Sequence, residues 1–342
     1  MPGLRFPAEW EDQSAVLVAW PHAGTDWAQR LVDVESAYTA LVKAIADSTT
    51  AIVCVADDAV RERAESLLTT ADVPASRVRY VPIPYDDTWL RDSGPITLRD
   101  GEAFHFLDFR FTGWGGKYEA GRDDALIAGL AERGLLQQDA IERIDFALEG
   151  GGIETDGKGT LLTTWRCLCE RHPDKSREEI ETVLKRSLRQ DRVLWLEHGY
   201  LEGDDTDAHI DTLARFAPND AIVFQACDDE ADRHHAELAA MANEIAALRT
   251  VEGQPYRLFP LPWAKPILDD GRRLAASYAN YLVTNGAVLI PAYGDVADAE
   301  AANVIAHAFP NRRIVQVPCR PLIWQNGSLH CVTMQIPQGA IL

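Results

Sequence analysis

Reactive side chains recur just ahead of hairpin-like segments in this 342-residue sequence. Glu149 precedes a triple glycine, His209 and Asp211 follow the run DDTDA, and Cys331 follows NGSLH. Because His209 and Asp211 are two residues apart, their side chains would share one face of a predicted strand. A carboxylate beside a histidine fixes its tautomer and stabilises its protonated form, which suits general acid–base catalysis. Cys331 would then be the nucleophile, provided that a cation or a protonated histidine favours its thiolate.

Three carboxylates indicate what this chemistry would act on. Asp92, Glu149 and Asp211 in one pocket would repel one another unless a cation lay between them. A guanidinium fits, because its paired N–H donors match carboxylate geometry. A metal ion bound by His209 and the three carboxylates is the alternative, and the residues alone leave both open. Taken singly, Cys331 or His209 is more often a packed core residue, so only their joint placement favours catalysis.

Aromatic residues lie close to these groups in the sequence. Trp89 is three residues before Asp92 and offers a face for a guanidinium, worth about 1–2 kcal/mol if desolvated, although simple core burial explains it equally well. The loop at 114–118, which begins with Trp114 and Gly115, is predicted either to wall or cover the pocket or to form a tight turn with packed aromatic rings.

The elements that must position these residues follow a repeated pattern. Four strand pairs joined by turn residues are predicted at 95–98 with 103–106, 151–154 with 160–164, 209–216 with 221–224, and 278–283 with 287–290. Helices with apolar residues at three- and four-residue spacing are predicted at 29–47, 124–133, 176–189, 229–248 and 297–308. Short strands are predicted at 193–196, 256–259 and 313–317. A last strand at 327–336 is expected to pair with 15–19.

The repeated unit is therefore a hairpin, a helix and a strand, present about five times. Repetition of this kind favours radial packing over a doubly wound sheet. In a radial array, equivalent ends of successive units point toward one axis, so the reactive residues would converge on one pocket. No linker-like stretch divides the sequence, and we expect one domain spanning residues 1–342.

Composition restricts the function classes further. The formal net charge of −20 argues against nucleic acid and anionic membranes as partners, and it serves either cation attraction or solubility. No stretch approaches the roughly 20 apolar residues of a membrane helix, and no signal-peptide pattern is present at the start. The six cysteines suit a reducing compartment, so we expect a cytoplasmic protein. Cys167 and Cys169 lack a second ligand pair, and the spacing predicts no zinc site there.

The motifs taken together resemble the agmatine deiminases, members of the guanidino-group-modifying pentein superfamily that also includes peptidylarginine and arginine deiminases. The resemblance covers nearly the whole chain. Its motifs are PAEW at 7–10, AWPH at 19–22, DTWLRDSGP at 87–95, GWGG at 113–116, EGGGIETDG at 149–157, GDDTDAHID at 203–211, SYAN at 277–280 and GSLHC at 327–331.

The resemblance implies an α/β pentein fold, a five-bladed propeller of pseudo-fivefold symmetry built from repeated ββαβ units. It implies that Cys331 is the nucleophile and His209 the general acid and base, and that no metal or organic cofactor is needed. The remaining implied site residues are Asp92 and Asp211 on the guanidinium, Glu149 supporting His209, and Trp89, Asp87, Asp205, Trp114 and Gly115 as substrate-binding residues.

The reaction implied is hydrolysis of agmatine to N-carbamoylputrescine and ammonia through a covalent Cys331 amidino-thioether, a step of putrescine biosynthesis. The partner is then a small cationic guanidine, and a homodimer is allowed for. Arginine or peptidyl-arginine deimination is the nearest alternative, with Lys117 or Arg215 to hold a substrate carboxylate. A metal-dependent amidinohydrolase is the more distant one. Departures from the family pattern at 164–172, at Ala208 and at 325–329 bear mainly on recognition of the substrate tail.

Overall fold

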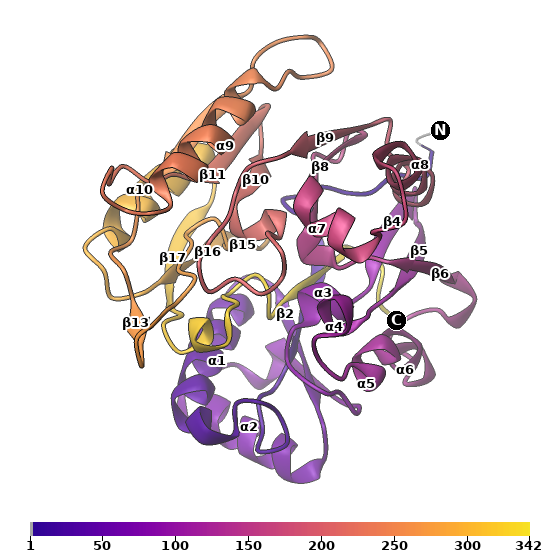
Figure 1. Ribbon diagram of the computed structural model, residues 1–342. Helices are drawn as coiled ribbons and strands as arrows, with labels where there is room; N and C mark the ends of the chain where they lie inside the picture. Colours follow the sequence, from indigo (N-terminus) through magenta and orange to yellow (C-terminus); the bar gives the residue numbers. More distant parts are fainter. Residues whose placement is uncertain (1–2) are drawn as a thin grey trace.

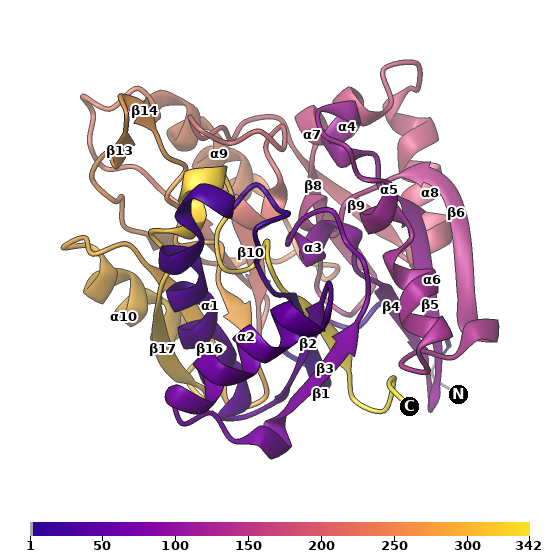
Figure 2. The same ribbon diagram turned by 90° about the horizontal axis from the view of Figure 1, so that it is seen from below.

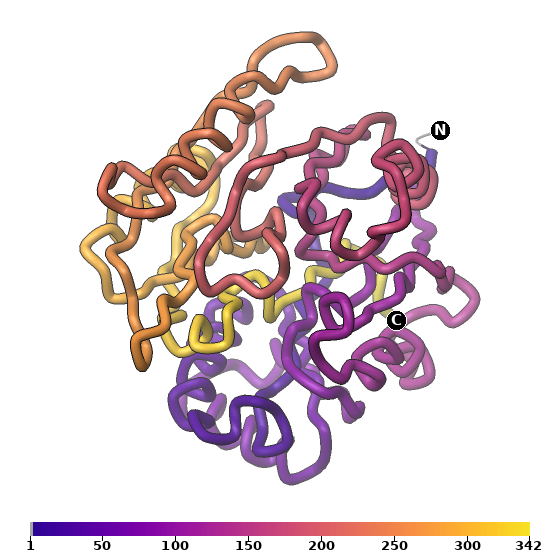
Figure 3. The backbone as a smooth tube through the Cα atoms, in the orientation of Figure 1, coloured from indigo at the N-terminus to yellow at the C-terminus, as the bar shows by residue number. Residues whose placement is uncertain are grey.

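Small sheets surround a common centre in the computed structural model, which describes residues 3–342 (Figure 1). In each of the five main sheets, an antiparallel pair of strands is followed by a helical segment and a third strand parallel to the second. The chain passes around the centre in sequence order, from the indigo segment to the orange one (Figure 3). These are the repeated units that the sequence predicts.

The elements group into the five units as follows. The first contains β1 (Gln13–Ala19), α1 (Leu31–Ala46), β2 (Thr50–Val55), α2 (Asp58–Thr70) and β3 (Val78–Pro82). The second contains α3 (Leu90–Ser93), β4 (Ile96–Asp100), β5 (Ala103–Arg110), α4 (Gly113–Gly116), α5 (Gly121–Asp124), α6 (Leu126–Glu132) and β6 (Ile141–Ala147). The third contains η4 (Gly150–Gly152), β7 (Ile153–Thr155), β8 (Thr160–Thr164), α7 (Trp165–Arg171), α8 (Arg177–Leu188) and β9 (Arg192–Leu196).

The last two units complete the ring. The fourth contains η5 (Ile210–Thr212), β10 (Ala214–Ala217), β11 (Ala221–Gln225), α9 (His235–Ala247) and β12 (Arg257–Leu261). A two-stranded ribbon of β13 (Leu268–Asp269) and β14 (Arg272–Arg273) leads to the fifth, which contains β15 (Leu282–Val283), β16 (Ala287–Ala292), α10 (Asp298–Ala308) and β17 (Arg313–Pro318).

The C-terminal strand β18 (Met334–Pro337) closes the ring by pairing antiparallel with β1, with Met334 opposite Leu17. Figure 2 shows this yellow strand beside the indigo strands of the first unit. The pairing predicted between the two ends of the sequence is therefore confirmed. It also explains how a residue near position 331 can meet residues from the other four units.

The predicted helices are confirmed to within a few residues, except that α9 begins at His235, six residues later than predicted, after turns at 230–234. Helix α8 shows why: Ser176 and Glu179 form a reciprocal capping box, and Ile180 and Leu184 place one apolar face in the core. The middle strands β8 and β11 are buried along their whole length, as expected where helices cover a parallel pair. Among residues 3–342, no helix combines the length and apolar character that crossing a membrane requires.

Three strands begin later than predicted, and the reactive residues lie in the turns ahead of them. The strand expected at 209–216 begins at Ala214, that at 278–283 begins at Leu282, and that at 327–336 begins at Met334. In the first case, Asp207 and Ala208 take left-handed backbone conformations before a single 3₁₀ turn. The prediction that His209 and Asp211 share a strand face is therefore wrong.

Candidate active site

Each of the five main sheets has a residue at the central site, located a few positions ahead of one of its antiparallel strands: β4, β7, β10, β15 or β18. Asp92 lies in α3, Glu149 precedes η4, Asp211 lies in η5, Asn280 precedes β15, and Cys331 precedes β18. His209 immediately precedes η5, and all six side chains are buried. The convergence expected from the spacing of the repeats is thus present, with Asn280 as a member that the sequence analysis placed in a motif without a role.

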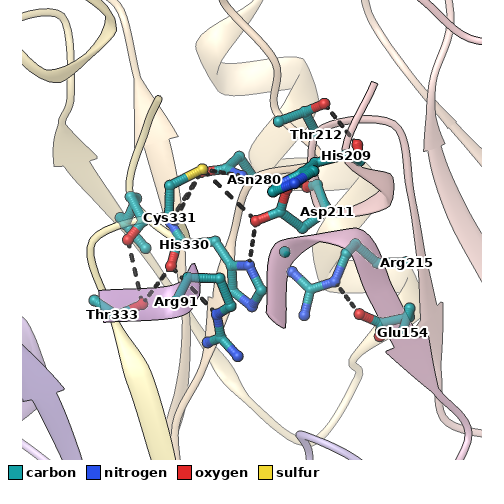
Figure 4. Close-up of polar contacts among 12 residues, drawn as sticks. Arg91, Glu154, His209, Asp211, Thr212, Arg215, Asn280, His330, Cys331 and Thr333 are labelled. Atoms are coloured by element: carbon teal, nitrogen blue, oxygen red, sulfur yellow. Dashed lines mark hydrogen bonds and ion pairs between the residues drawn. The ribbon is translucent and has the colours of Figure 1, made fainter. Parts of the chain in front are cut away.

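Cys331 faces two polar groups across the centre (Figure 4). Its thiol lies 3.6 Å from Oδ2 of Asp211 and accepts a hydrogen bond from Nδ2 of Asn280 at 3.2 Å. Burial raises the pKa of the Cys331 thiol well above its ordinary value, and the charges of Asp211 and Asp92 raise it further. The thiol therefore stays protonated until a cation offsets the two carboxylates.

His209 lies between two carboxylates: Glu149, which the resemblance implies as its support, and Asp92, which the sequence analysis placed on the guanidinium. Nδ1 is 3.6 Å from Oδ1 of Asp92, and Nε2 is 3.5 Å from Oε2 of Glu149. Burial lowers the pKa of His209, but the charges of Asp92 and its other neighbours outweigh burial and raise it well above the ordinary value. His209 is thus an imidazolium at neutral pH and can donate a proton.

Asp92 is held in place by two donors. The backbone N–H of Gly151 donates to Oδ1 and the indole of Trp114 donates to Oδ2, both at 2.9 Å. Burial raises the pKa of Asp92 to about 6, because the opposing effect of His209 is partly cancelled by Asp211 and Glu149. A Cβ at Gly151 would lie 2.6 Å from Nδ1 of His209 and 2.7 Å from Oδ1 of Asp92, which explains a glycine at this point.

Glu149 is fixed by a buried arginine that the sequence analysis did not single out. Nε of Arg171, in α7, donates to Oε1 of Glu149 at 2.7 Å, and Nη1 donates to Asp207 at the same distance. Burial raises the pKa of Glu149, but contacts with His209 and Arg171 lower it below the ordinary value overall. Glu149 is therefore a carboxylate that keeps a negative charge beside His209.

A cavity of about 670 Å³ opens onto Cys331 and Asp92. Trp89 forms part of its wall and packs tightly on Gly327, where a Cβ would lie 2.2 Å from the indole ring. Burial raises the pKa of Asp87, in the same wall, to about 7. The other lining residues include Asp26, Asp86, Asp123, Glu119, Asp205, Trp114, Tyr118, Arg272, Trp324 and Asn326.

The predicted substrate-binding residues are therefore distributed unevenly. Trp89, Asp87, Asp205 and Trp114 line the cavity. Gly115 is exposed, has a positive φ of 84°, and is not among the residues that line this cavity within 3–342. Its predicted contact with substrate has no support in this geometry, whereas the neighbouring Trp114 acts directly on Asp92.

Behind Cys331 lies a chain of buried charged groups. Oδ2 of Asp211 contacts Nδ1 of His330 at 2.8 Å, and Nε2 of His330 contacts Glu9 at 2.7 Å. Arg215 then bridges Glu9 at 2.7 Å and Glu154 at 2.5 Å (Figure 4 shows the Arg215–Glu154 pair). His330 was missed by sequence reasoning, although it stands directly before the predicted nucleophile.

The alternative metal set, His209 with Asp92, Glu149 and Asp211, does not assemble around one point. Asp92 and Glu149 lie at opposite nitrogens of His209, so one ion cannot bind the imidazole and both carboxylates. Asp211 has its Oδ2 engaged by His330. The arrangement instead leaves Oδ1 of Asp211 buried without a hydrogen-bond partner in residues 3–342, close to the thiol, where an N–H donor of a ligand would satisfy it.

Comparison with known proteins agrees with this site. The model of the Porphyromonas-type peptidyl-arginine deiminase family matches residues 5–337. Agmatine deiminase of Stutzerimonas stutzeri (strain A1501) is 32% identical over 98% of this chain and 96% of its own.

Solved structures give the same fold. A C. jejuni agmatine deiminase variant with substrate bound has a TM-score of 0.90 at 32% identity, over 98% of this chain and 97% of its own. A Porphyromonas gingivalis protein proposed to be an arginine deiminase has a TM-score of 0.92 at 44% identity, over 99% of this chain and 100% of its own. The resemblance to agmatine deiminases and the pentein α/β fold predicted from the sequence are both confirmed.

Proposed function

Because the chain belongs to the Porphyromonas-type peptidyl-arginine deiminase family, we propose that it is an agmatine deiminase, which converts agmatine and water to N-carbamoylputrescine and ammonia. One observation carries this proposal. The Cys331 thiol lies beside Asp211, whose buried Oδ1 lacks a partner within 3–342, and it lines a cavity whose wall includes seven acidic residues. A cationic guanidine supplies the donors and the charge that this site lacks.

Substrate binding would prepare the nucleophile. We infer that the guanidinium lies between Asp92 and Asp211, with the ring of Trp89 along the cavity wall. Its charge offsets the two carboxylates that raise the pKa of Cys331, so the thiolate becomes accessible once the substrate is bound. Asn280, whose amide donates to Sγ, holds the sulfur in place.

The chemistry then proceeds in two halves. The Cys331 thiolate attacks the guanidinium carbon, and the C–N bond to one amino group breaks as His209 donates a proton, releasing ammonia and leaving an amidino-thioether. Neutral His209 next takes a proton from water, which attacks the same carbon. The C–S bond breaks, the hydroxyl proton of the product passes to solvent to leave a ureido group, and the thiolate is restored.

The cavity outside the guanidinium position suits a cationic tail. Asp87 and Asp205 lie in its wall, as do four further acidic residues. Agmatine carries an ammonium at the end of its chain, whereas arginine carries a carboxylate there as well. Asp87→Asn is expected to raise KM for agmatine several-fold with little change in kcat, because the residue contacts the tail and not the reacting carbon.

Arginine deimination is the second candidate, because one arginine, Arg272, lines the cavity. The residues first expected to hold a carboxylate are occupied: Lys117 pairs with Asp207, and Arg215 is buried with Glu9 and Glu154. Arg272 does line the cavity, where it hydrogen-bonds Asn326 and the backbone of Trp324. The P. gingivalis protein proposed to be an arginine deiminase is also the more similar of the two structures compared above.

Ammonia release from purified protein separates these candidates. Agmatine and L-arginine are supplied in parallel to the wild type, to Cys331→Ala and to chelator-treated protein. Release from agmatine, abolished in Cys331→Ala and unaffected by chelator, is the expected result. Release from arginine alone would overturn the substrate, and release by Cys331→Ala would overturn the nucleophile.

We further propose a single catalytic domain over 1–342, a cytoplasmic location and a homodimer. The six cysteines are all free thiols, as suits a reducing compartment. Cell fractionation tests the location, and light scattering on the purified protein tests the oligomeric state.

A further inference from the structure

A cysteine outside the proposed reaction lies against the active-site histidine. Cys167, in α7, is completely buried, and its sulfur, a carboxylate oxygen of Glu149 and a ring nitrogen of His209 all lie within 4.8 Å of one another. The spacing of cysteines along the sequence could not predict this group, because its three members come from three separate segments of the chain.

Two of the three candidate ligand atoms make no hydrogen bond in the described chain. Nε2 of His209 and Oε2 of Glu149 are buried and lack hydrogen-bond partners within residues 3–342. Buried polar atoms are ordinarily satisfied, so unpartnered ones within 4.8 Å of the same thiol indicate a missing ligand at that point. Arg171 occupies only the opposite oxygen, Oε1, and leaves Oε2 free.

The separation of these atoms fits a tetrahedral metal ion. Nε2 and Oε2 are 3.5 Å apart. Zinc bonds of about 2.1 Å to nitrogen and oxygen at tetrahedral angles place the two donors roughly 3.4 Å apart. One thiolate, one imidazole and one carboxylate suit zinc and related thiophilic ions, whereas magnesium and calcium prefer oxygen ligands alone.

The groups around the three donors also have the arrangement that metal ligands need. Oδ1 of Asp92 lies 3.6 Å from Nδ1 of His209 and can hold the imidazole with Nε2 directed at the ion. Arg171 fixes Glu149 from the other side at 2.7 Å. Arg171 therefore orients one ligand, Glu149, before any ion arrives, and Asp92 lies where it can face Nδ1 once Nε2 binds the ion.

We propose that Glu149, Cys167 and His209 bind a thiophilic divalent ion such as Zn²⁺, with water as a fourth ligand, and that the bound ion inhibits the enzyme. Inhibition follows because an ion on Nε2 removes the proton that His209 supplies to the leaving group. The binding site goes beyond the proposed function, and only the inhibition rests on it.

Binding is measured with Co²⁺ alone, in Cys331→Ala protein so that the nucleophile cannot act as the ligand. We expect one ion per chain and the charge-transfer absorption of a cobalt–thiolate bond. Cys331→Ala/Cys167→Ser is expected to lose this absorption and to bind on the order of a hundredfold more weakly, since even outer contacts change metal affinity by about 10–100-fold. Cys331→Ala/Cys169→Ala, altered on the same helix, is the matched control and retains both.

An unchanged cobalt–thiolate absorption in Cys331→Ala/Cys167→Ser would overturn the site. Circular dichroism verifies that this protein is folded. If it is not, Cys331→Ala/His209→Asn, which removes a different ligand, takes its place in the test. Wild-type ammonia release is then expected to fall with Zn²⁺, to recover with chelator and to be indifferent to Mg²⁺. Full activity at Zn²⁺ concentrations that saturate the site would overturn the inhibition while leaving the binding result intact.

Discussion

Two buried histidines in this molecule each lie between two carboxylates, yet their settings differ. His209 is 3.5–3.6 Å from Glu149 and Asp92, and neither ring nitrogen has a hydrogen-bond partner in the described chain. His330 makes two contacts of 2.7 and 2.8 Å, with Glu9 and Asp211. The first is held loosely, and the second is fixed from both sides.

The charges nearby widen the difference. Burial lowers the pKa of both rings, but the carboxylates around His209 prevail and raise its pKa. Beside His330, Arg215 and Arg91 add to burial, and its pKa is lowered. The two hydrogen bonds of the Asp211–His330–Glu9 chain each need a proton. A neutral imidazole supplies one, and the other is carried by His330 or by one of the two carboxyl groups. A loosely held cation can exchange its proton with a ligand, whereas a proton within such a chain is retained.

Replacing His209 should therefore have the largest effect on turnover. We expect His209→Asn to lower kcat by roughly 10²–10⁴-fold, the usual contribution of a general acid–base group. Steady-state ammonia release measures the loss, and circular dichroism verifies that the protein is folded. A folded His209→Asn protein with near wild-type kcat would contradict the role given to this histidine.

Removing Arg171, which holds Glu149 beside His209, should have the next largest effect, and this effect is on stability. Arg171→Met removes the partner of Glu149 and leaves a buried charge uncompensated, because both side chains are only 1% exposed. We expect a loss of roughly 3–5 kcal/mol in the free energy of unfolding. Denaturant titration measures it, with Arg166→Met, exposed on the same helix, as the control. Equal losses in the two variants would show that the ion pair contributes little.

The sequence could identify His209, Cys331 and, through the resemblance, Glu149 as a support of His209, but not Asp92 as the second neighbour of the imidazole. The polar residue types ahead of each repeated hairpin, together with the family motifs, were sufficient to place them at one centre. The pairing of His209 with Asp92 and Glu149 depends on the turns at Asp207 and Ala208, whose left-handed backbone no spacing rule predicts. The two-residue spacing paired Asp211 with His209 instead, because a strand was predicted where a 3₁₀ turn occurs.

The fold was predictable to a greater extent than the site. Five amphipathic helices and the closing pair of β1 and β18 follow from local periodicity and turn chemistry. Helix α2 with β2 and β3 was not predicted. Arg171, Asn280 and His330 reach the centre from separate units, and their roles depend on contacts between residues far apart in the chain. Such contacts leave no periodic trace in one sequence.

Replacing His330 should affect stability more than the chemistry. His330→Gln leaves a buried oxygen of Glu9 or Asp211 without its partner, and we expect a loss of about 1–3 kcal/mol in the free energy of unfolding. We expect kcat to fall by no more than about tenfold, through displacement of Asp211 from the thiol. His307→Gln, exposed on α10, is the control. A kcat loss as large as that of His209→Asn would erase the distinction between the two histidines.

The smallest expected effect is a pH dependence of kcat/KM that arises from Asp92, the neighbour of His209. The pKa of Asp92 is raised to about 6, and only its carboxylate form can hold a guanidinium. We expect kcat/KM for agmatine to reach half its plateau near that pH and to fall about tenfold for each further pH unit below it. Because Asp87 titrates at about 7, the profile is also measured in Asp87→Asn, where the limb near 6 should persist.

The stability of the protein should move in the opposite direction over the same range. Because folding raises the pKa of Asp92 above its ordinary 3.8, the contribution of this group is fully present below 3.8 and is lost as the pH rises through about 6. Relative to wild type, Asp92→Asn should therefore gain free energy of unfolding as the pH rises through this window. His330→Gln should show the reverse trend as the pH rises toward 6.5, because folding lowers the pKa of His330. If Asp92→Asn tracked the wild type at every pH, the electrostatic setting described for His209 would be wrong, and the acid limb of kcat/KM would have to arise from another group.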